Sequence, residues 1–265
     1  MTFLERLEGS ARATGNLLCL GLDPVPERIE PLGVDIETFL ERILERLEGE
    51  ECLPSTLKPN LAYFEQFGSK GWAMLERLLE GWSSKCLIIA DAKRGDIGRS
   101  SEAYARAMFE HLKADAVTVS PWMGADSIAP FLARAPQRGT YLLVRTSNPG
   151  HADLQAATWQ SLATRVREWK AGAVVGATSV EDLARAVELL GPEVPLLIPG
   201  VGTQGGEATA VMQALGAEPW RHRVNVSSAI LYAYEQHPEL DFSAAASRAA
   251  KAYAKSLSPH RPHNH

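Results

Sequence analysis

The chain has 265 residues, 45% of them hydrophobic and 22% charged, with a net charge of -5 at pH 7. This length and apolar content suit one barrel-sized domain better than two ordinary ones. The acidic balance argues against non-specific nucleic-acid binding, no apolar run approaches the roughly 20 residues of a membrane span, and Met1–Gly15 lacks the apolar core of a secretory signal.

Eight short apolar runs are typical of buried strands. In chain order they are Leu17–Leu22, Ser55–Leu57, the run that begins at Leu87, Ala116–Val119, Tyr141–Val144, Ala173–Val175, Leu196–Ile198 and Val224–Val226. Between and after these runs the apolar residues recur at helical spacing. The expected helices are Thr38–Leu47, Trp72–Leu79, Ser100–Leu112, Ser127–Ala133, Thr158–Trp169, Ser179–Leu190, Ala208–Leu215 and Phe242–Leu257.

This alternation of strand and helix predicts a parallel sheet with right-handed crossovers. Eight units of this size favour a closed (β/α)8 TIM barrel over a doubly wound open sheet. We therefore expect a single barrel domain over residues 1–258. The tail, residues 259–265, carries His260, His263 and His265 among prolines, which is more typical of a flexible end than of a metal site.

The three cysteines, Cys19, Cys52 and Cys86, are odd in number and widely spaced. This pattern indicates buried thiols in a reducing compartment rather than a disulfide framework, a metal site or a redox site. A cytoplasmic protein is therefore expected.

Polar residues follow several of the predicted strands. In a TIM barrel the active site is assembled at the carboxyl ends of the strands. The residues that fall there are Asp23, Lys58, Asp91, Lys93, Ser147 and Gln204.

Three charged residues of interest, Asp91, Lys93 and Asp96, lie close together in the stretch Leu87–Gly98. Side chains two residues apart share a face of a strand, so Asp91 and Lys93 point the same way at the carboxyl end. Asp96 follows where the chain turns toward the next helix. Such a group of charges is either a structural ion-pair network or part of a catalytic site. The D-x-K pattern by itself favours the structural network.

Several motifs together resemble one enzyme family. Asp91–Ser100 is similar to the D-x-K-x-x-D-I-x-x-T signature of orotidine 5'-phosphate decarboxylase. Leu57–Asn60, Arg145–Gly150 and Pro199–Gly206 resemble the longer bacterial branch of that family. The D-x-K-x-x-D element is shared with a wider group of phosphosugar barrels, but its combination with the other motifs is specific.

The resemblance implies that the chain converts orotidine 5'-monophosphate to uridine 5'-monophosphate in pyrimidine biosynthesis. It implies that Lys93 protonates C6 of the pyrimidine and that Asp91 lies beside the departing carboxylate. Lys58 and Asp96 would complete a network of alternating charges. Because lysine is not a metal ligand in such a network, we expect no metal and no cofactor.

The resemblance also implies a homodimer in which Asp96 and Ser100 complete the neighbouring subunit's site. Ser100 stands where the family carries threonine and keeps the hydroxyl. Asp23 would bind ribose hydroxyls, and Ser147 and Gln204 would contact the pyrimidine and close over the phosphate.

The glycine run Gly200–Gly206 either permits a tight turn or brings backbone amides close to a phosphate. We favour the phosphate and include Gly202, Gly205, Ser227 and Ser228 in its site. The family usually carries an arginine where this chain has Ser228.

A substitute cation for that arginine would be Arg145, favoured over Arg223 because Arg223 lies near the start of its strand. A site without any arginine is the third option. Two other functions also remain open: a different phosphosugar decarboxylase or synthase, which would be expected to use a divalent metal, and a non-catalytic barrel that binds phosphate ligands.

Overall fold

The computed structural model describes residues 1–202 and 205–259, although for residues 205–207 it describes only the backbone. Gln204 and the tail histidines therefore lie outside the described residues. Eight parallel strands form a closed barrel in the order β1 to β8, with β8 pairing with β1. The strands are β1 Leu18–Leu22, β2 Thr56–Pro59, β3 Leu87–Arg94, β4 Ala116–Val119, β5 Gly139–Arg145, β6 Gly172–Val175, β7 Leu196–Ile198 and β8 Arg223–Val226. The predicted barrel is confirmed.

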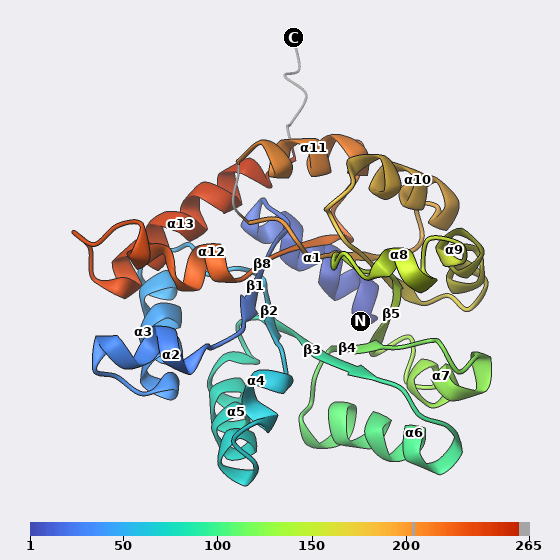
Figure 1. Cartoon of the computed structure of the whole chain (residues 1–265), viewed down its shortest axis with the longest axis horizontal. Coiled ribbons are helices and arrows are strands. Elements are labelled where there is room, and N and C mark those ends of the chain that lie inside the picture. The colour runs from blue at the N-terminus through green and yellow to red at the C-terminus, as the bar shows by residue number, and fades with distance from the viewer. Residues whose placement is uncertain (203–204, 260–265) are drawn as a thin grey trace.

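Each of the expected helices is present within a few residues of its predicted bounds, and together they surround the strands (Figure 1). They are α3 Ile36–Gly49, α5 Ser69–Trp82, α6 Gly98–Arg106, α7 Ala125–Leu132, α9 Trp159–Glu168, α10 Val180–Leu190, α11 Gly205–Leu215 and α13 Phe242–Ser256. The predicted helix that begins at Ser100 continues beyond α6 as a π-helical segment, Ala107–His111.

Short helices that the sequence analysis did not include lie mainly at the carboxyl end of the barrel, in the connections that follow strands. They are α2 Pro26–Ile29, α4 Ala62–Glu65, α8 His151–Leu154 and α12 Ser228–Leu231, together with the 3-10 turns Glu30–Leu32 and Ala233–Glu235. Elements of one turn leave too little periodicity in a sequence to be read as helices.

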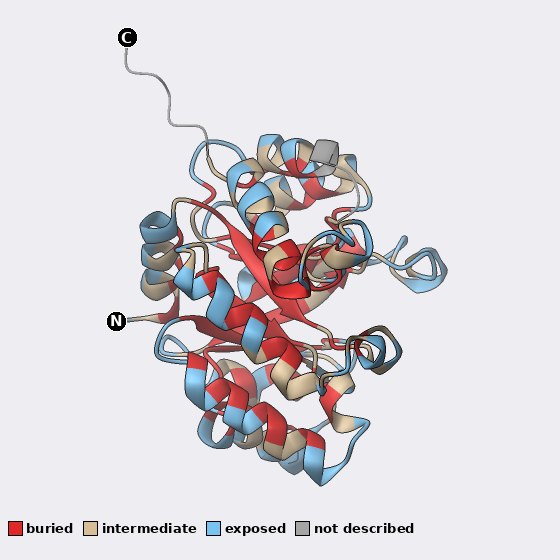
Figure 2. Cartoon of the chain, turned by 90° about the vertical axis from the view of Figure 1, so that its left-hand side faces the viewer, coloured by how far each residue is buried: buried red, intermediate tan, exposed pale blue. Residues whose placement is uncertain are grey.

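The core has two parts. The larger lies between the outer faces of the strands and the inner faces of the helices, which Figure 2 shows as red strands flanked by helices that are pale blue on the outside. The smaller part fills the barrel itself and includes Cys19, Ile89, Tyr141 and Leu197. A packed interior leaves the ends of the barrel as the places where polar groups can gather.

An additional N-terminal helix, α1 (Phe3–Thr14), closes the amino end of the barrel. Its Phe3 and Leu7 join the core cluster of the barrel interior. Thr2 and Glu5 form a reciprocal capping box that starts the helix. The opposite, carboxyl end is the one at which a TIM barrel assembles its active site.

Candidate active site

Asp91, near the carboxyl end of β3, lies at the centre of the charged group. Its Oδ2 accepts a hydrogen bond from Lys58 Nζ at 2.7 Å, and its Oδ1 accepts one from Lys93 Nζ at 2.7 Å. Thr118 Oγ1 donates a third hydrogen bond to Oδ1 at 2.9 Å. Three neighbouring strands, β2, β3 and β4, therefore bring two ammonium groups and one hydroxyl to a single carboxylate.

Lys58 lies inside β2 rather than after it, because the strand runs two residues further than predicted. Its side chain is only 5% exposed, whereas that of Lys93 is 49% exposed. The buried lysine can hold Asp91 in place, and the half-exposed one can reach a ligand above the barrel.

The charges control the protonation of the group. Burial alone would raise the pKa of Asp91, but the charges of Lys58 and Lys93 outweigh it and lower that pKa to about 2. Burial would lower the pKa of Lys58, but the carboxylates of Asp91 and Asp23 raise it above its usual value. Asp91 is therefore ionised and Lys58 protonated at neutral pH.

The backbone of Lys93 is unusual, with φ at +45°, a region that residues other than glycine rarely adopt. The pairing of β3 with β4 is also irregular between Ala90 and Arg94. Thr118 Oγ1 accepts a hydrogen bond from Lys93 N at 2.9 Å and so holds the backbone in this conformation. Strained backbone of this kind is concentrated at functional sites.

Thr118 was missed by the sequence analysis. It is 1% exposed and occupies a strand that is otherwise apolar, Ala116–Val119. A single hydroxyl in a buried strand near its carboxyl end is the signal that could have revealed it.

Asp23 and Asn225 line a cavity of about 530 Å³ at the carboxyl ends of β1, β7 and β8. Each has a buried Oδ1 atom with no hydrogen-bond partner among the described residues. Gly202, Ser227 and Ser228 line the same cavity. Five polar or glycine positions from three strand ends therefore meet where a polar ligand can satisfy unpaired groups.

Ser147 lies in the loop after β5, close to residues that follow β6 and β7. A Cβ atom added to Gly176 would come within 2.9 Å of Ser147, and one added to Gly200 within 3.3 Å. The two glycines, which follow β6 and β7, therefore permit the loop after β5 to approach the cavity side of the barrel. Gly205 is the first residue of α11.

Asp96 and Ser100 lie in and after the loop that follows β3. Asp96 accepts a hydrogen bond from the backbone N–H of Ile97 at 2.8 Å, and in the described part of the chain it makes no ion pair with Lys58 or Lys93. Ser100 is exposed on α6. Within one chain, the network of alternating charges ends at Lys93.

Neither arginine that was considered as a substitute cation is available to a phosphate. Arg145 is 4% exposed; its Nε lies 2.7 Å from Asp182 Oδ2, and it also donates to Thr178 Oγ1 at 3.0 Å. The preference for Arg145 was therefore wrong, because its guanidinium ties β5 to α10 instead of facing the cavity.

Arg223 is fully buried at the amino end of β8, as its position predicted. Its guanidinium donates to Thr56 Oγ1 at 2.8 Å and to the carbonyl oxygens of Leu7 and His222. It therefore connects α1 to the barrel.

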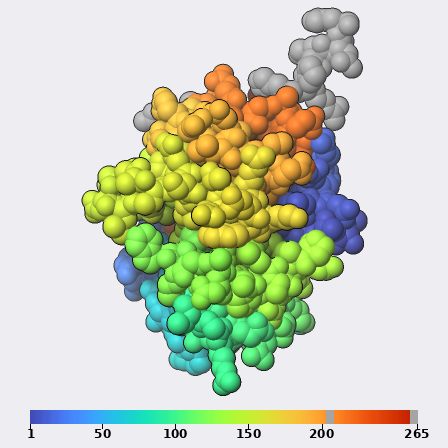
Figure 3. Space-filling view, turned by 90° about the vertical axis from the view of Figure 1, so that its right-hand side faces the viewer, coloured from blue at the N-terminus to red at the C-terminus, as the bar shows by residue number. Residues whose placement is uncertain are grey.

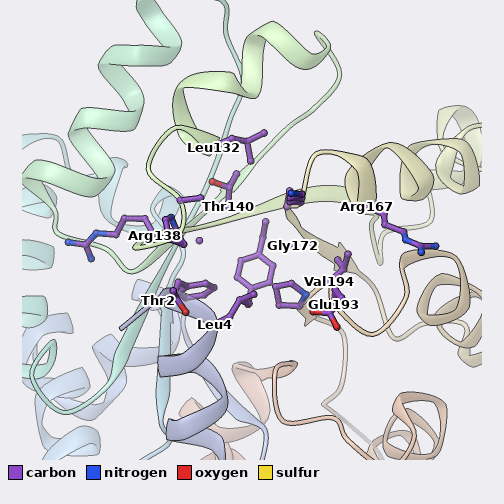
Figure 4. Close-up of a pocket in the computed structure, with 17 residues that line it drawn as sticks. Thr2, Leu4, Leu132, Arg138, Thr140, Arg167, Gly172, Glu193 and Val194 are labelled. Carbon is purple, nitrogen blue, oxygen red and sulfur yellow. The ribbon is translucent and has the colours of Figure 1, made fainter.

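Another cavity, of about 570 Å³, lies at the amino end of the barrel beside the start of α1 (Figure 4). Its wall is mostly apolar, and Figure 4 shows the guanidinium groups of Arg138 and Arg167 pointing away from it. No charged residue of the carboxyl-end group reaches this cavity, so it does not belong to the candidate site.

Residues 16–240 match the sequence model of the family described as "Orotidine 5'-phosphate decarboxylase / HUMPS family". The chain belongs to this family. A relative from Roseiflexus castenholzii, named orotidine 5'-phosphate decarboxylase, is 43% identical over 95% of each chain. A relative of the same name from Herpetosiphon aurantiacus is 37% identical over 99% of each chain.

The solved structure of Leishmania donovani OMP decarboxylase is 32% identical and covers 97% of this chain and 99% of its own, with a TM-score of 0.80. The group formed by Lys58, Asp91 and Lys93 lies at the carboxyl end of the barrel, where TIM-barrel enzymes have their active sites. Among the residues that the structure describes, no group of three or more His, Cys, Asp or Glu is placed to hold a metal ion.

Proposed function

We propose that this chain decarboxylates orotidine 5'-monophosphate to uridine 5'-monophosphate, a step of pyrimidine biosynthesis. The observation that carries the proposal is the Lys58–Asp91–Lys93 group at the carboxyl end of the barrel. Family membership and the names of the 37–43% identical relatives support the choice of substrate.

The reaction breaks the bond between C6 of the pyrimidine and its carboxylate carbon. The electron pair stays on C6, carbon dioxide leaves, and the Lys93 ammonium stabilises the carbanion and delivers a proton to C6. The half-exposed side chain of Lys93 can then take up a proton from solvent. No other reactant is needed, and the proposal involves no cofactor.

Asp91 has a second effect in this scheme. Its pKa of about 2 keeps it ionised, so it repels the carboxylate of the bound substrate. The repulsion disappears as that carboxylate becomes neutral carbon dioxide, which favours the transition state over the ground state. Lys58 holds Asp91 in place at 2.7 Å while the substrate's charge changes.

We assign the remaining polar positions to substrate binding. Asp23, with its unpaired buried Oδ1, binds ribose hydroxyls. Ser147 and Gln204 contact the pyrimidine and close over the phosphate, although Gln204 lies outside the described residues. Glycines and serines at the strand ends surround the phosphate, namely Gly202, Gly205, Ser227 and Ser228.

We further propose that the enzyme is a homodimer in which Asp96 and Ser100 complete the partner's site. Two observations support this. Asp96 has no ion pair within the described residues, and large apolar side chains are exposed in the adjacent loops after β3 and β4: Ile97 is 56%, Trp122 72% and Met123 44% exposed. Exposed apolar side chains that lie together mark protein–protein contacts. The elements α6 and α7, which flank these loops, belong to the green part of Figure 3.

The proposal includes a cytoplasmic location and no nucleic-acid partner. All three cysteines are free, as expected in a reducing compartment. No helix in the described ranges is both long and apolar enough to cross a membrane.

The loss of orotidine 5'-monophosphate absorbance with purified protein, measured with and without a chelator, tests the function. We expect turnover that the chelator does not change. Turnover of a keto-sugar phosphate that stops with chelator would instead favour the synthase branch of the family. Binding without any turnover would favour a non-catalytic barrel.

A further inference from the structure

A positive charge strengthens the binding of a dianionic phosphate such as that of the proposed substrate, and the cavity beside Ser227 and Ser228 contains one. Among the described residues that line this cavity of about 530 Å³, Arg28 is the one cation. It comes from α2, which follows β1, and lines the same cavity as Ser228 and Gly202. Hydroxyls and amides can solvate a phosphate, but only a cation such as Arg28 can also balance its charge.

Arg28 is held firmly in this place. Its guanidinium carbon lies 3.5 Å from the centre of the Tyr232 ring, a cation–π contact. The Tyr234 hydroxyl donates to the carbonyl oxygen of Arg28. The hydroxyl of Tyr232 accepts a hydrogen bond from Val25 N at 2.6 Å and donates to Asp23 O at 3.0 Å. The ring that supports Arg28 therefore also fixes the loop that carries Asp23.

The guanidinium of Arg28 still has donors to offer. Nε donates to Glu235 Oε1 and one terminal nitrogen, Nη2, donates to Glu235 Oε2, both at 2.7 Å. The other terminal nitrogen has no partner in the part of the chain that the structure describes. The Arg28 side chain is 32% exposed, so a ligand can reach it. The Glu235 side chain is 44% exposed, so it can turn into solvent.

We infer that Arg28 is the cation that binds the substrate phosphate in this chain. The free terminal nitrogen of Arg28 donates to the phosphate. Before the substrate binds, Glu235 holds the guanidinium in place, and the Glu235 carboxylate moves away when the phosphate binds. The inference rests on the proposed function, since the phosphate belongs to the proposed substrate. It also explains how the site can operate with serine at position 228.

The test compares the binding of uridine 5'-monophosphate with that of uridine, which lacks the phosphate. The variants are Arg28→Ala, Arg28→Lys and Glu235→Gln, each checked for its melting temperature. Loss of charge-assisted hydrogen bonds should reduce the preference of Arg28→Ala for the nucleotide by about 10- to 150-fold, with uridine affinity unchanged. Arg28→Lys should keep part of the preference, and Glu235→Gln should keep or increase it.

A rescue variant separates phosphate binding from a structural role. Ser228 is exposed and lines the same cavity, so Ser228→Arg combined with Arg28→Ala supplies a cation from another position in the lining. We expect the double variant to regain most of the preference for the nucleotide. If Arg28→Ala and Glu235→Gln instead weaken both ligands equally, the pair only fastens the loop and the inference is wrong.

The ratio of the affinities for uridine 5'-monophosphate and for uridine is a binding measurement and does not depend on turnover. A wild-type protein that prefers the nucleotide but does not decarboxylate orotidine 5'-monophosphate would contradict the proposed function and leave the role of Arg28 intact. A wild-type protein that binds nucleotide and nucleoside equally would overturn the role of Arg28.

Discussion

Replacing Thr118 with valine removes one buried hydroxyl and almost no volume. In the native site this hydroxyl donates to Asp91 at 2.9 Å and accepts from Lys93 N at 2.9 Å. Its loss leaves a backbone N–H without its acceptor, which costs about 1–3 kcal/mol when the group is buried. It also releases the backbone of Lys93 from φ at +45°, a conformation that itself costs about 1–3 kcal/mol to maintain.

If half or more of the first cost, about 0.5–3 kcal/mol, falls on the transition state, kcat should fall by about 2- to 160-fold. Binding of uridine 5'-monophosphate should change less than twofold, because the phosphate and ribose contacts lie elsewhere. The assay is steady-state decarboxylation together with nucleotide binding, and Thr118→Ser, which keeps the hydroxyl, is the matched control. A folded Thr118→Val protein with the kcat of the wild type would refute the view that Thr118 positions Lys93.

Two further predictions concern the assembly and the stability. Mixing inactive Asp91→Ala and Asp96→Ala homodimers should restore partial activity, since one of the two sites in the mixed dimer carries neither lesion; no recovery after demonstrated subunit exchange would mean that each site is built from one chain. Burial lowers the pKa of His222 from its usual value near 6.5 to about 3, with help from neighbouring arginines. As the pH falls below about 6.5, His222 becomes protonated in the unfolded chain but not in the folded one. Protonation therefore favours the unfolded chain, and the free energy of unfolding should fall with the pH. In His222→Asn, which keeps an acceptor for the backbone N–H of Leu196, the loss between pH 7 and pH 5 measured by urea unfolding should be about 2 kcal/mol smaller than in the wild type; an equal loss would contradict this.

The barrel could be predicted because its strands are continuous apolar runs and its main helices have clear periodicity. Leu196–Ile198 is a three-residue example that matches the structure at both ends. The shared face of Asp91 and Lys93 followed from strand geometry alone, and their side chains are in contact at 2.7 Å. The position of Arg223 at the far end followed from its place at the start of β8.

Features that depend on distant parts of the chain could not be predicted. Arg28 and Glu235 are 207 residues apart and meet only when β8 closes the barrel beside β1. Arg145 stands directly before the loop at the barrel mouth, but its guanidinium turns outward to Asp182, a choice that sequence position does not reveal. Thr118 was overlooked because a lone threonine in a strand is common, and its importance comes from the unusual backbone of Lys93.

The central claim is that Lys93 delivers the proton to C6. Lys93→Ala removes that ammonium, and Lys170→Ala is a matched control because Lys170 is an exposed lysine that also has a positive φ, at +55°. Both variants lose one positive charge and place alanine in a left-handed conformation, so they carry the same backbone cost.

The measurement is the rate of orotidine 5'-monophosphate decarboxylation by each variant, together with its affinity for uridine 5'-monophosphate. Loss of a positioned acid costs about 100- to 10,000-fold, and because Lys93 also stabilises the carbanion we expect Lys93→Ala to reach or exceed the upper value. Nucleotide binding should persist, and Lys170→Ala should be as active as the wild type. Near-normal decarboxylation by a folded Lys93→Ala protein would contradict the mechanism.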